Sequence, residues 1–203
     1  MWVLFFTEMW ERFSYYGMRA LLVLYLTSTL INGGFAFAEN HALEIYGIFT
    51  GLVYLTPIIG GIVADRLIGQ RKAIVIGGII MGLGNAAMAY SEAVVNLVNV
   101  SSPEAALELR QYWLYIGLAL LILGNGFFKP NISTLVGRLY PEGDPRKDSA
   151  FTIFYMGINL GAFLAPLVAG YLGESIGWSY GFGSAAVGMF VGTIWFWSQE
   201  SKL

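Results

Sequence analysis

The chain has 203 residues, of which 57% are hydrophobic, only 12% are charged and 26 are glycine. A soluble domain usually carries about twice that charged fraction, so the composition indicates an integral membrane protein rather than a large soluble core. The absence of cysteine excludes disulfides and thiol metal sites, and a net charge of −2 gives no reason to expect nucleic acid as a partner.

The first apolar stretch, residues 2–29, is distinguished by its charges. Inside it lie Glu8, Glu11, Arg12 and Arg19. At about 100° per residue, these four and Tyr15 fall within roughly 100° of arc on a helix. One face of the predicted helix is therefore polar along much of its length, while the remainder can meet lipid or other helices.

Five further membrane spans follow, because each span needs about 20 mostly apolar residues. They are predicted at residues 43–64, 73–90, 112–139, 150–172 and 180–197. A polar stretch separates the third from the fourth, and within it Ser102, Pro103 and Glu104 are typical of a helix start. The sequence predicts an all-α membrane protein, with residues 1–203 forming one bundle of six transmembrane helices.

The loops differ in charge between the two sides of the predicted bundle. One side carries Arg66, Arg71, Lys72, Arg138, Arg146, Lys147 and Lys202. The other carries Glu39, Glu92, Glu104, Glu108 and Glu174 against the single Arg110. Because basic loops face the cytoplasm, we expect both termini to be cytoplasmic and the protein to lie in the inner or plasma membrane.

The six helices divide into two units of three with opposite orientation. Inverted units of this kind form each half of major-facilitator transporters. Six helices alone are also compatible with a channel, a receptor fragment or a membrane enzyme.

Five charges, including Lys129 of the fourth span, lie at membrane depth in the first and fourth helices. Each costs about 2.5–3.5 kcal/mol near a helix centre, so five unpaired charges would cost on the order of 12–17 kcal/mol. They must face an interior or water-filled cavity. The cluster can be a structural set of ion pairs, but charges inside a membrane favour a functional role.

The arrangement of these charges suggests two tasks. Glu8 and Glu11, one turn apart beside Arg12, form a plausible site for loading and releasing a proton. Arg19 and Lys129 are left to attract an anionic group, the first as a planar fork and the second as a point charge.

Several other polar residues occupy predicted spans. Tyr155 and Asn159 share a face of the fifth helix, and Asn159 is expected to be a buried amide that needs several partners. Tyr54 precedes Pro57 in the second helix. The alternative for each is a buried helix contact; for Tyr54 the two explanations are equal, whereas Asn159 is less easily explained in that way. His41 is best explained as an interfacial residue.

The segment GGIVADRLIGQRK, residues 60–72, ends the second span with small residues followed by an acid among bases. Asp65 is placed to pair with Arg66, Arg71 or a neighbouring helix end, which would make a cytoplasmic gate latch; the alternative is a simple basic turn. No phosphate-binding loop, metal-ligand cluster or nucleophile triad is present in the sequence. We therefore expect no enzyme activity and no cofactor beyond the proton.

Four segments resemble motifs of one transporter family. They are EMWERFSYYG (residues 8–17), GGIVADRLIG (60–69), GNGFFKPNIS (124–133) and FTIFYMGINLGAF (151–163). In this order they are similar to the motifs of the proton-dependent oligopeptide transporter family, within the major facilitator superfamily.

The resemblance implies uptake of di- and tripeptides driven by an inward proton gradient. It implies that Glu8, Glu11 and Arg12 couple protons, with Lys129 as their salt-bridge partner. It places Arg19 and Lys129 near the peptide carboxylate, and it implies that Tyr16, Tyr54, Tyr155 and Asn159 line the peptide cavity. The helix-two histidine of animal members corresponds to Gly47, so His41 gains no role.

The family has two six-helix bundles, and this chain corresponds to the first. We expect it to be a fragment of a longer chain or to pair with a chain that supplies the second bundle, and not to transport alone. The alternatives are a proton-coupled transporter of another anion such as nitrate, or a membrane scaffold whose charged cluster is structural. A membrane enzyme is a third, less favoured alternative.

Overall fold

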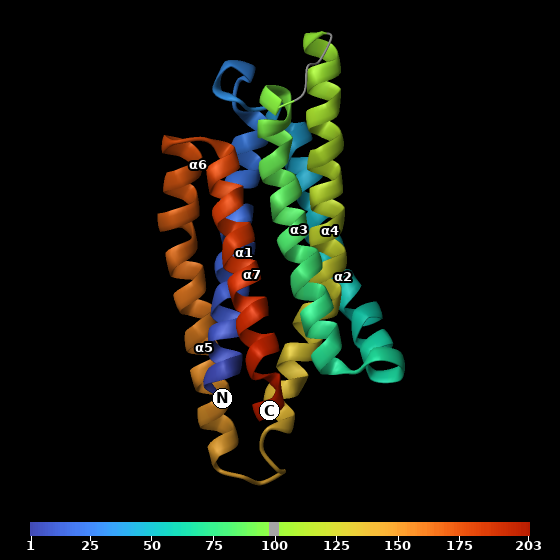
Figure 1. Ribbon diagram of the computed structural model, residues 1–203, viewed down its shortest axis with the longest axis vertical. Coiled ribbons are helices and arrows are strands. Elements are labelled where there is room, and N and C mark those ends of the chain that lie inside the picture. Colours follow the sequence, from blue (N-terminus) through green and yellow to red (C-terminus); the bar gives the residue numbers. More distant parts are fainter. Residues whose placement is uncertain (98–101) are drawn as a thin grey trace.

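The computed structural model describes residues 1–97 and 102–203, which form helices and no strands (Figure 1). The long helices are α1 (Trp2–Thr27), α2 (Glu39–Val63), α3 (Gln70–Leu97), α4 (Pro103–Arg138), α5 (Arg146–Ala165) and α7 (Trp178–Gln199). A π-helical turn, Ala64–Ile68, extends α2, and another, Pro166–Gly170, joins α5 to the short α6 (Tyr171–Ser175). Single 3-10 turns occupy Leu30–Asn32 and Glu200–Lys202.

The prediction of an all-α fold with six long helices is confirmed over the described residues. The helices differ from the predicted spans mainly between the third and the fourth, where the polar stretch is largely helical. α3 continues to Leu97 and α4 begins at Pro103, while residues 98–101 of this stretch lie outside the described residues. The predicted start of α4 is correct, since the Ser102 hydroxyl accepts a hydrogen bond of 3.2 Å from Ala105 N.

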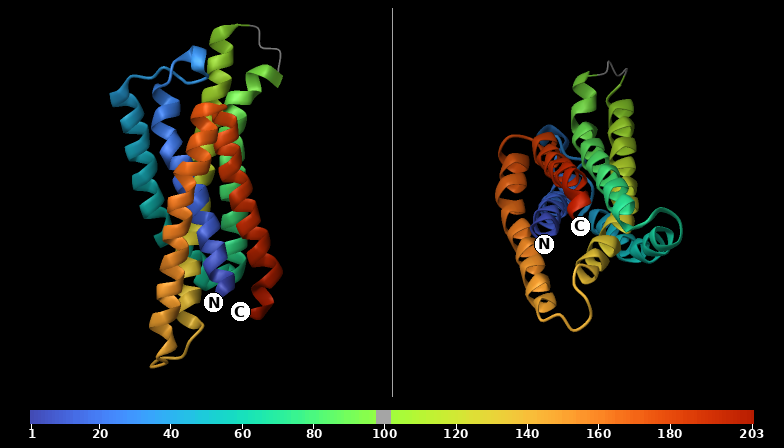
Figure 2. Two further views of the ribbon diagram at one scale, coloured as in Figure 1. Left: turned by 90° about the vertical axis from the view of Figure 1, so that its left-hand side faces the viewer. Right: turned by 60° about the horizontal axis from the view of Figure 1, so that its bottom comes forward.

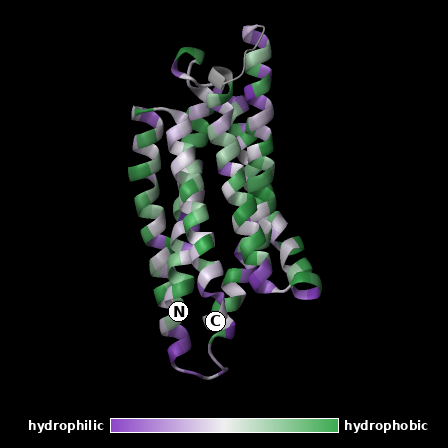
Figure 3. Ribbon diagram, viewed as in Figure 1, coloured by the Kyte–Doolittle hydropathy of each residue, from purple (hydrophilic) through white to green (hydrophobic). Residues whose placement is uncertain are grey.

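Four stretches are long and apolar enough to cross a membrane, namely Glu39–Ile68, Gln70–Val94, Pro103–Arg138 and Arg146–Ser175. α1 falls outside this set because its 26 residues include four charges. Hydrophobic residues occupy most of the middle of the bundle, and hydrophilic residues gather towards its ends (Figure 3). The chain is a multi-pass membrane protein; the membrane boundaries of its spans stay a prediction.

The arrangement of the helices places α1 at the centre. α1 packs against α5 and α7, whereas α3 packs against α4 and α7, and α2 packs against α4 (Figures 1 and 2). Both chain termini lie at one end of the bundle, here called the terminal end (Figure 1). α3 ends and α4 begins at the opposite end, here called the α3–α4 end.

Small residues bring α3 and α4 into close contact. A Cβ atom built on Gly124 would lie 2.6 Å from Met81 Cγ and 2.7 Å from the backbone oxygen of Gly77. Only glycine fits at this contact without moving one helix. The absence of side chains allows the two backbones to pack directly, as small residues do between membrane helices.

Candidate functional site

One arginine pairs with both buried carboxylates of α1. Glu8, Glu11 and Arg12 are 3%, 0% and 4% exposed. Arg12 Nη2 donates a hydrogen bond of 2.5 Å to Glu11 Oε1, and Arg12 Nε donates to Glu11 Oε2. The same Nε lies 3.2 Å from Glu8 Oε1. One positive charge is thus shared by two negative charges, and Glu8 Oε2 has no hydrogen-bond partner among the described residues.

Lys129 approaches this cluster from α4 without bonding to it. Its Nζ atom lies 5.5 Å from the centre of the Tyr54 ring, and its charge interacts through space with those of Arg12, Glu11 and Glu8. Within the described parts of the chain, no carboxylate is within 4.0 Å of its ammonium group. The expected salt bridge from Lys129 is therefore not formed in this structure, because Arg12 already binds both carboxylates.

The second cationic group of the polar face, Arg19, is held by α2. Its Nε atom donates a hydrogen bond to the Tyr46 hydroxyl, and its guanidinium lies 5.3 Å from the centre of the Tyr46 ring. Sequence reasoning missed Tyr46. The signal was present, because Tyr46, Thr50 and Tyr54 recur at intervals of four and therefore share one face of α2.

Aromatic rings separate the two cationic groups of α1. The Arg12 guanidinium lies 5.2 Å from the centre of the Tyr15 ring and 5.8 Å from that of Tyr16. Tyr15 is buried, whereas Tyr16 is partly exposed. The face predicted to be polar thus divides into a buried ion cluster near the terminal end and a more exposed part around Tyr16 and Arg19.

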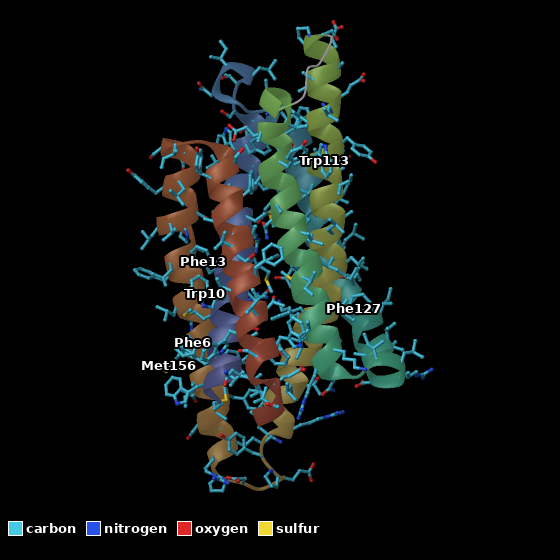
Figure 4. All side chains as sticks on the ribbon, viewed as in Figure 1. Phe6, Trp10, Phe13, Trp113, Phe127 and Met156 are labelled. Carbon is cyan, nitrogen blue, oxygen red and sulfur yellow. The ribbon has the colours of Figure 1, made fainter. Side chains whose placement is uncertain are left out.

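The other face of α1 is apolar. Phe6, Trp10 and Phe13 lie along α1 (Figure 4), and Phe6 packs against Trp195 of α7 with the ring centres 5.7 Å apart. Trp10 and Phe13 line an apolar groove of about 510 Å³ between α5 and α7, together with Leu164 and Val187. The separation of charged from apolar side chains on one helix agrees with the pattern expected from the sequence.

The predicted residues of α5 lie on an open surface, which corrects one expectation. Asn159 is exposed and not buried, and its Nδ2 donates a hydrogen bond of 2.9 Å to the backbone oxygen of Tyr155. This bond uses one hydrogen of Nδ2, and the remaining groups of the amide face the open surface. Tyr155 on the same face is 57% exposed, and Tyr54 on α2 is 62% exposed.

At the terminal end, Asp65 pairs with α4. Arg138 Nη2 lies 4.0 Å from Asp65 Oδ1, and Gln70 Nε2 donates a hydrogen bond of 3.3 Å to the same oxygen. Of the partners left open by the sequence, the neighbouring helix end is the one found. Among the described residues, Arg66 forms no ion pair with Asp65.

His41 stands apart from the cluster. Its Nδ1 atom lies 3.6 Å from Glu44 Oε2, and both side chains are exposed near the start of α2. In the part of the chain that the structure describes, no three His, Cys, Asp or Glu side chains are grouped so that they could hold a metal ion.

Known proteins with a similar sequence and fold are transporters. A profile of the POT family matches residues 71–201. The chain is 47% identical over 202 residues to the uncharacterized transporter YclF of Bacillus subtilis (strain 168), covering 100% of this chain and 38% of YclF. It is 43% identical over 196 residues to a di-/tripeptide transporter of Lactococcus lactis subsp. cremoris, covering 96% of this chain and 36% of that protein.

The fold agrees with the sequence comparison. The crystal structure of peptide transporter POT in complex with sulfate matches with a TM-score of 0.85 and 46% identity, over 99% of this chain and 37% of that one. The chain therefore spans well under half the length of the relatives it matches.

Proposed function

The chain belongs to the POT family, and we propose that it forms the amino-terminal half of a symporter that carries di- and tripeptides into the cell together with protons. Its similarity to a di-/tripeptide transporter supports the substrate class. The buried carboxylates that share Arg12 support proton coupling and are the observation on which the proposal depends.

Proton loading would change which groups are paired. When a proton neutralises Glu8 or Glu11, Arg12 no longer serves two negative charges, and the remaining carboxylate takes the whole guanidinium. Lys129 is then less strongly attracted to the cluster and is free to bind an anionic group. Loss of the proton reverses the change. The carboxylates and Lys129 thus link proton binding to anion binding through their shared electrostatics.

The peptide would bind at the open part of the polar face. Arg19 and Lys129 supply positive charge for its carboxylate. The proposed lining residues are Tyr16, Tyr54, Tyr155 and Asn159. Tyr54, Tyr155 and Asn159 are exposed on this bundle, and Tyr16 is partly exposed, as a surface shared with substrate and a second bundle requires. In the cycle we propose, a carboxy-terminal six-helix bundle closes this cavity and rocks against the first.

We also propose that the terminal end faces the cytoplasm of a cell with this protein in its inner or plasma membrane. Arg66, Arg71 and Arg138 lie at this end, where hydrophilic residues gather (Figure 3). Asp65 and Arg138 would act there as a latch at the cytoplasmic gate, with Arg66 as an additional basic group.

Two substitutions test the proposal in the complete transporter that contains this half. Glu11→Gln removes a proton-binding group, and Lys129→Ala removes the cation that responds to it. We expect each to abolish uptake of a labelled dipeptide into proteoliposomes under an inward proton gradient. The matched controls, Glu44→Gln and Lys72→Ala, change exposed residues and should leave uptake unchanged.

Concentrative uptake at the normal rate in both test variants would refute proton coupling by this cluster. Uptake of nitrate that unlabelled dipeptide fails to inhibit would refute the substrate class.

A further inference from the structure

Two asparagines are buried in the core of the bundle, Asn85 on α3 and Asn125 on α4. Asn85 and Asn125 are 0% and 1% exposed. Asn85 Nδ2 donates hydrogen bonds of 3.0 Å to Ser14 Oγ and 3.3 Å to the backbone oxygen of Met81. Asn85 Oδ1 has no partner among the described residues, and neither do Nδ2 and Oδ1 of Asn125. Three buried amide atoms therefore lack a hydrogen bond from the residues that the structure describes.

Leaving such atoms unpaired costs free energy in a membrane protein. A buried amide without a partner loses its hydration and gains nothing in return, and the surrounding lipid cannot replace the lost bonds. Buried polar side chains are nearly always paired with protein groups or ordered water. A leucine at either position would remove the cost, so an asparagine there indicates that the amide binds something.

Met81 contacts Asn85 and the residue next to Asn125. Asn85 bonds to the Met81 backbone, and a Cβ on Gly124, the neighbour of Asn125, would lie 2.6 Å from Met81 Cγ. Met81 thus packs where the two segments that carry the unpaired groups, one on α3 and one on α4, meet.

Ser14, which bonds to Asn85, and Asn125 each lie one helical turn from a residue of the charged cluster. Ser14 follows Glu11 by three residues on α1, and Asn125 precedes Lys129 by four residues on α4, so each shares a face with its charged neighbour. Both lie on the side of the cluster that faces the α3–α4 end.

The unpaired atoms specify the chemistry of the ligand. Two of the three are carbonyl oxygens, which accept hydrogen bonds, and the third is an amide nitrogen, which donates them. All three are neutral, so none of them favours a cation or an anion as its ligand. Water both donates and accepts, and a buried water typically makes about three hydrogen bonds. We propose that Asn85, Asn125 and Ser14 hold internal water between α1, α3 and α4, behind the carboxylates and apart from the peptide cavity.

This water would hydrate Glu11 while its pairing with Arg12 changes, and that role rests on the proposed proton coupling. The existence of the water site does not depend on proton coupling. The two statements therefore need separate experiments.

Radiolytic hydroxyl-radical labelling of the complete transporter tests the site itself. Radicals formed from water inside the protein oxidise side chains that touch it, even where bulk solvent has no access. Met18, Met81 and Met88 are all 0% exposed, and of these three Met81 is the one that Asn85 bonds to and that packs at Gly124, next to Asn125. We expect Met81 to be oxidised several-fold faster than the other two. Labelling of Met81 as slow as that of Met18 and Met88 would overturn the proposal.

A pair of variants makes the labelling test specific. Asn125→Leu should slow the oxidation of Met81. Asn131→Leu is the matched control on the same helix, because Asn131 is equally buried but its amide donates to the backbone oxygen of Phe127. Fast labelling of Met81 in both variants would show that Asn125 does not hold the water. Should Asn125→Leu fail to fold, the comparison of the three methionines in the unmodified transporter still decides.

Transport assays test the role. We expect Asn125→Leu to slow proton-driven dipeptide uptake by about tenfold, as loss of one hydrogen bond to a charged group predicts, while counterflow exchange at equal pH stays normal. An equal loss of both activities would overturn the role, and so would unchanged proton-driven uptake. Failure of the proposed function itself would be recognised separately, as absence of dipeptide uptake by the unmodified transporter.

Discussion

The charged residues of α1 show how a membrane helix tolerates side chains that lipid alone would exclude. Arg12 places one guanidinium between two carboxylates, and aromatic rings cover its remaining surface. Each of these charges would cost about 2.5–3.5 kcal/mol on an isolated helix. Pairing within about one turn of the same helix offsets part of that cost, and one negative charge remains in excess.

A second buried arginine organises the α3–α4 end. Arg110 is 8% exposed and donates hydrogen bonds to the backbone oxygens of Gly33 and Ser91. Its guanidinium also lies 4.7 Å from the centre of the Phe35 ring. Ser91 in turn donates a hydrogen bond of 2.7 Å to the backbone oxygen of Arg110. Arg110 thus ties the loop between α1 and α2 to both α3 and α4.

Replacement of Arg110 should therefore weaken the bundle. We expect Arg110→Lys to destabilise the protein by about 2 kcal/mol, because an ammonium group cannot reach two separate carbonyls and stack on an aromatic ring together. The measurement is the thermal unfolding midpoint in detergent. Arg71→Lys, an exposed arginine at the other end, is the control. An unchanged midpoint in Arg110→Lys would contradict the structural role given to this residue.

At the scale of helices, the start of α5 depends on a residue outside the membrane spans. Asp144 Oδ1 accepts a hydrogen bond of 2.8 Å from the Arg146 backbone, and its Oδ2 lies 2.7 Å from Arg146 Nη2. The hydrogen bonds from the Arg146 side chain and backbone lower the pKa of Asp144 to about 2. Because the folded pKa is below the usual value of about 3.9, this support for α5 is present above that value and lost only as the pH falls towards 2.

Hydrogen exchange tests this contribution. We expect Asp144→Ala to raise exchange several-fold at the first amides of α5, because both the acceptor and the ion pair are lost. In the unmodified protein, protection of these amides should be the same at about pH 5 and pH 7 after correction for the intrinsic rate. Glu142→Ala, at an exposed acid of the same loop, is the control. Protection that falls between these two pH values would show that the pKa of Asp144 is not lowered.

At the scale of the whole molecule, large apolar side chains remain uncovered on two helices at opposite edges of the bundle. α2 and α5 lie on opposite sides of α1 and α4 (Figures 1 and 2). Ile58 and Ile59 on α2 are 63% and 66% exposed, and Phe163 on α5 is 64% exposed. These apolar faces flank the exposed tyrosines of the proposed cavity. A second bundle would pack against the same faces.

Separate expression of the two halves tests this dependence. We expect membranes that contain only residues 1–203 to show no proton-driven dipeptide uptake, because alternating access requires two bundles that move against each other. Co-expression with the remainder of the complete transporter should restore uptake. Membranes with the second half alone serve as the control. Uptake by this half alone would contradict the proposed division of the site between two bundles.

The residues that could be predicted are those whose role depends on local spacing. Glu8, Glu11 and Arg12 fall on one helical face because an α-helix turns about 100° per residue, and the structure pairs them. The start of α4 follows from Ser102 and Pro103 for the same reason, since capping involves only the next few residues. Asn159 was placed wrongly because a sequence does not show which faces of α5 the other helices cover.

The sequence by itself determined the six helices, the membrane class and the polar face of α1, because helical periodicity and hydropathy are local properties. Only the tertiary structure decided how those residues are bonded. It gave both carboxylates to Arg12, left Lys129 beside Tyr54 and joined Arg19 to Tyr46. It also buried the Asn125 amide without a hydrogen-bond partner among the described residues. These pairings depend on which helices lie next to each other, and spacing within one helix carries no information about its neighbours.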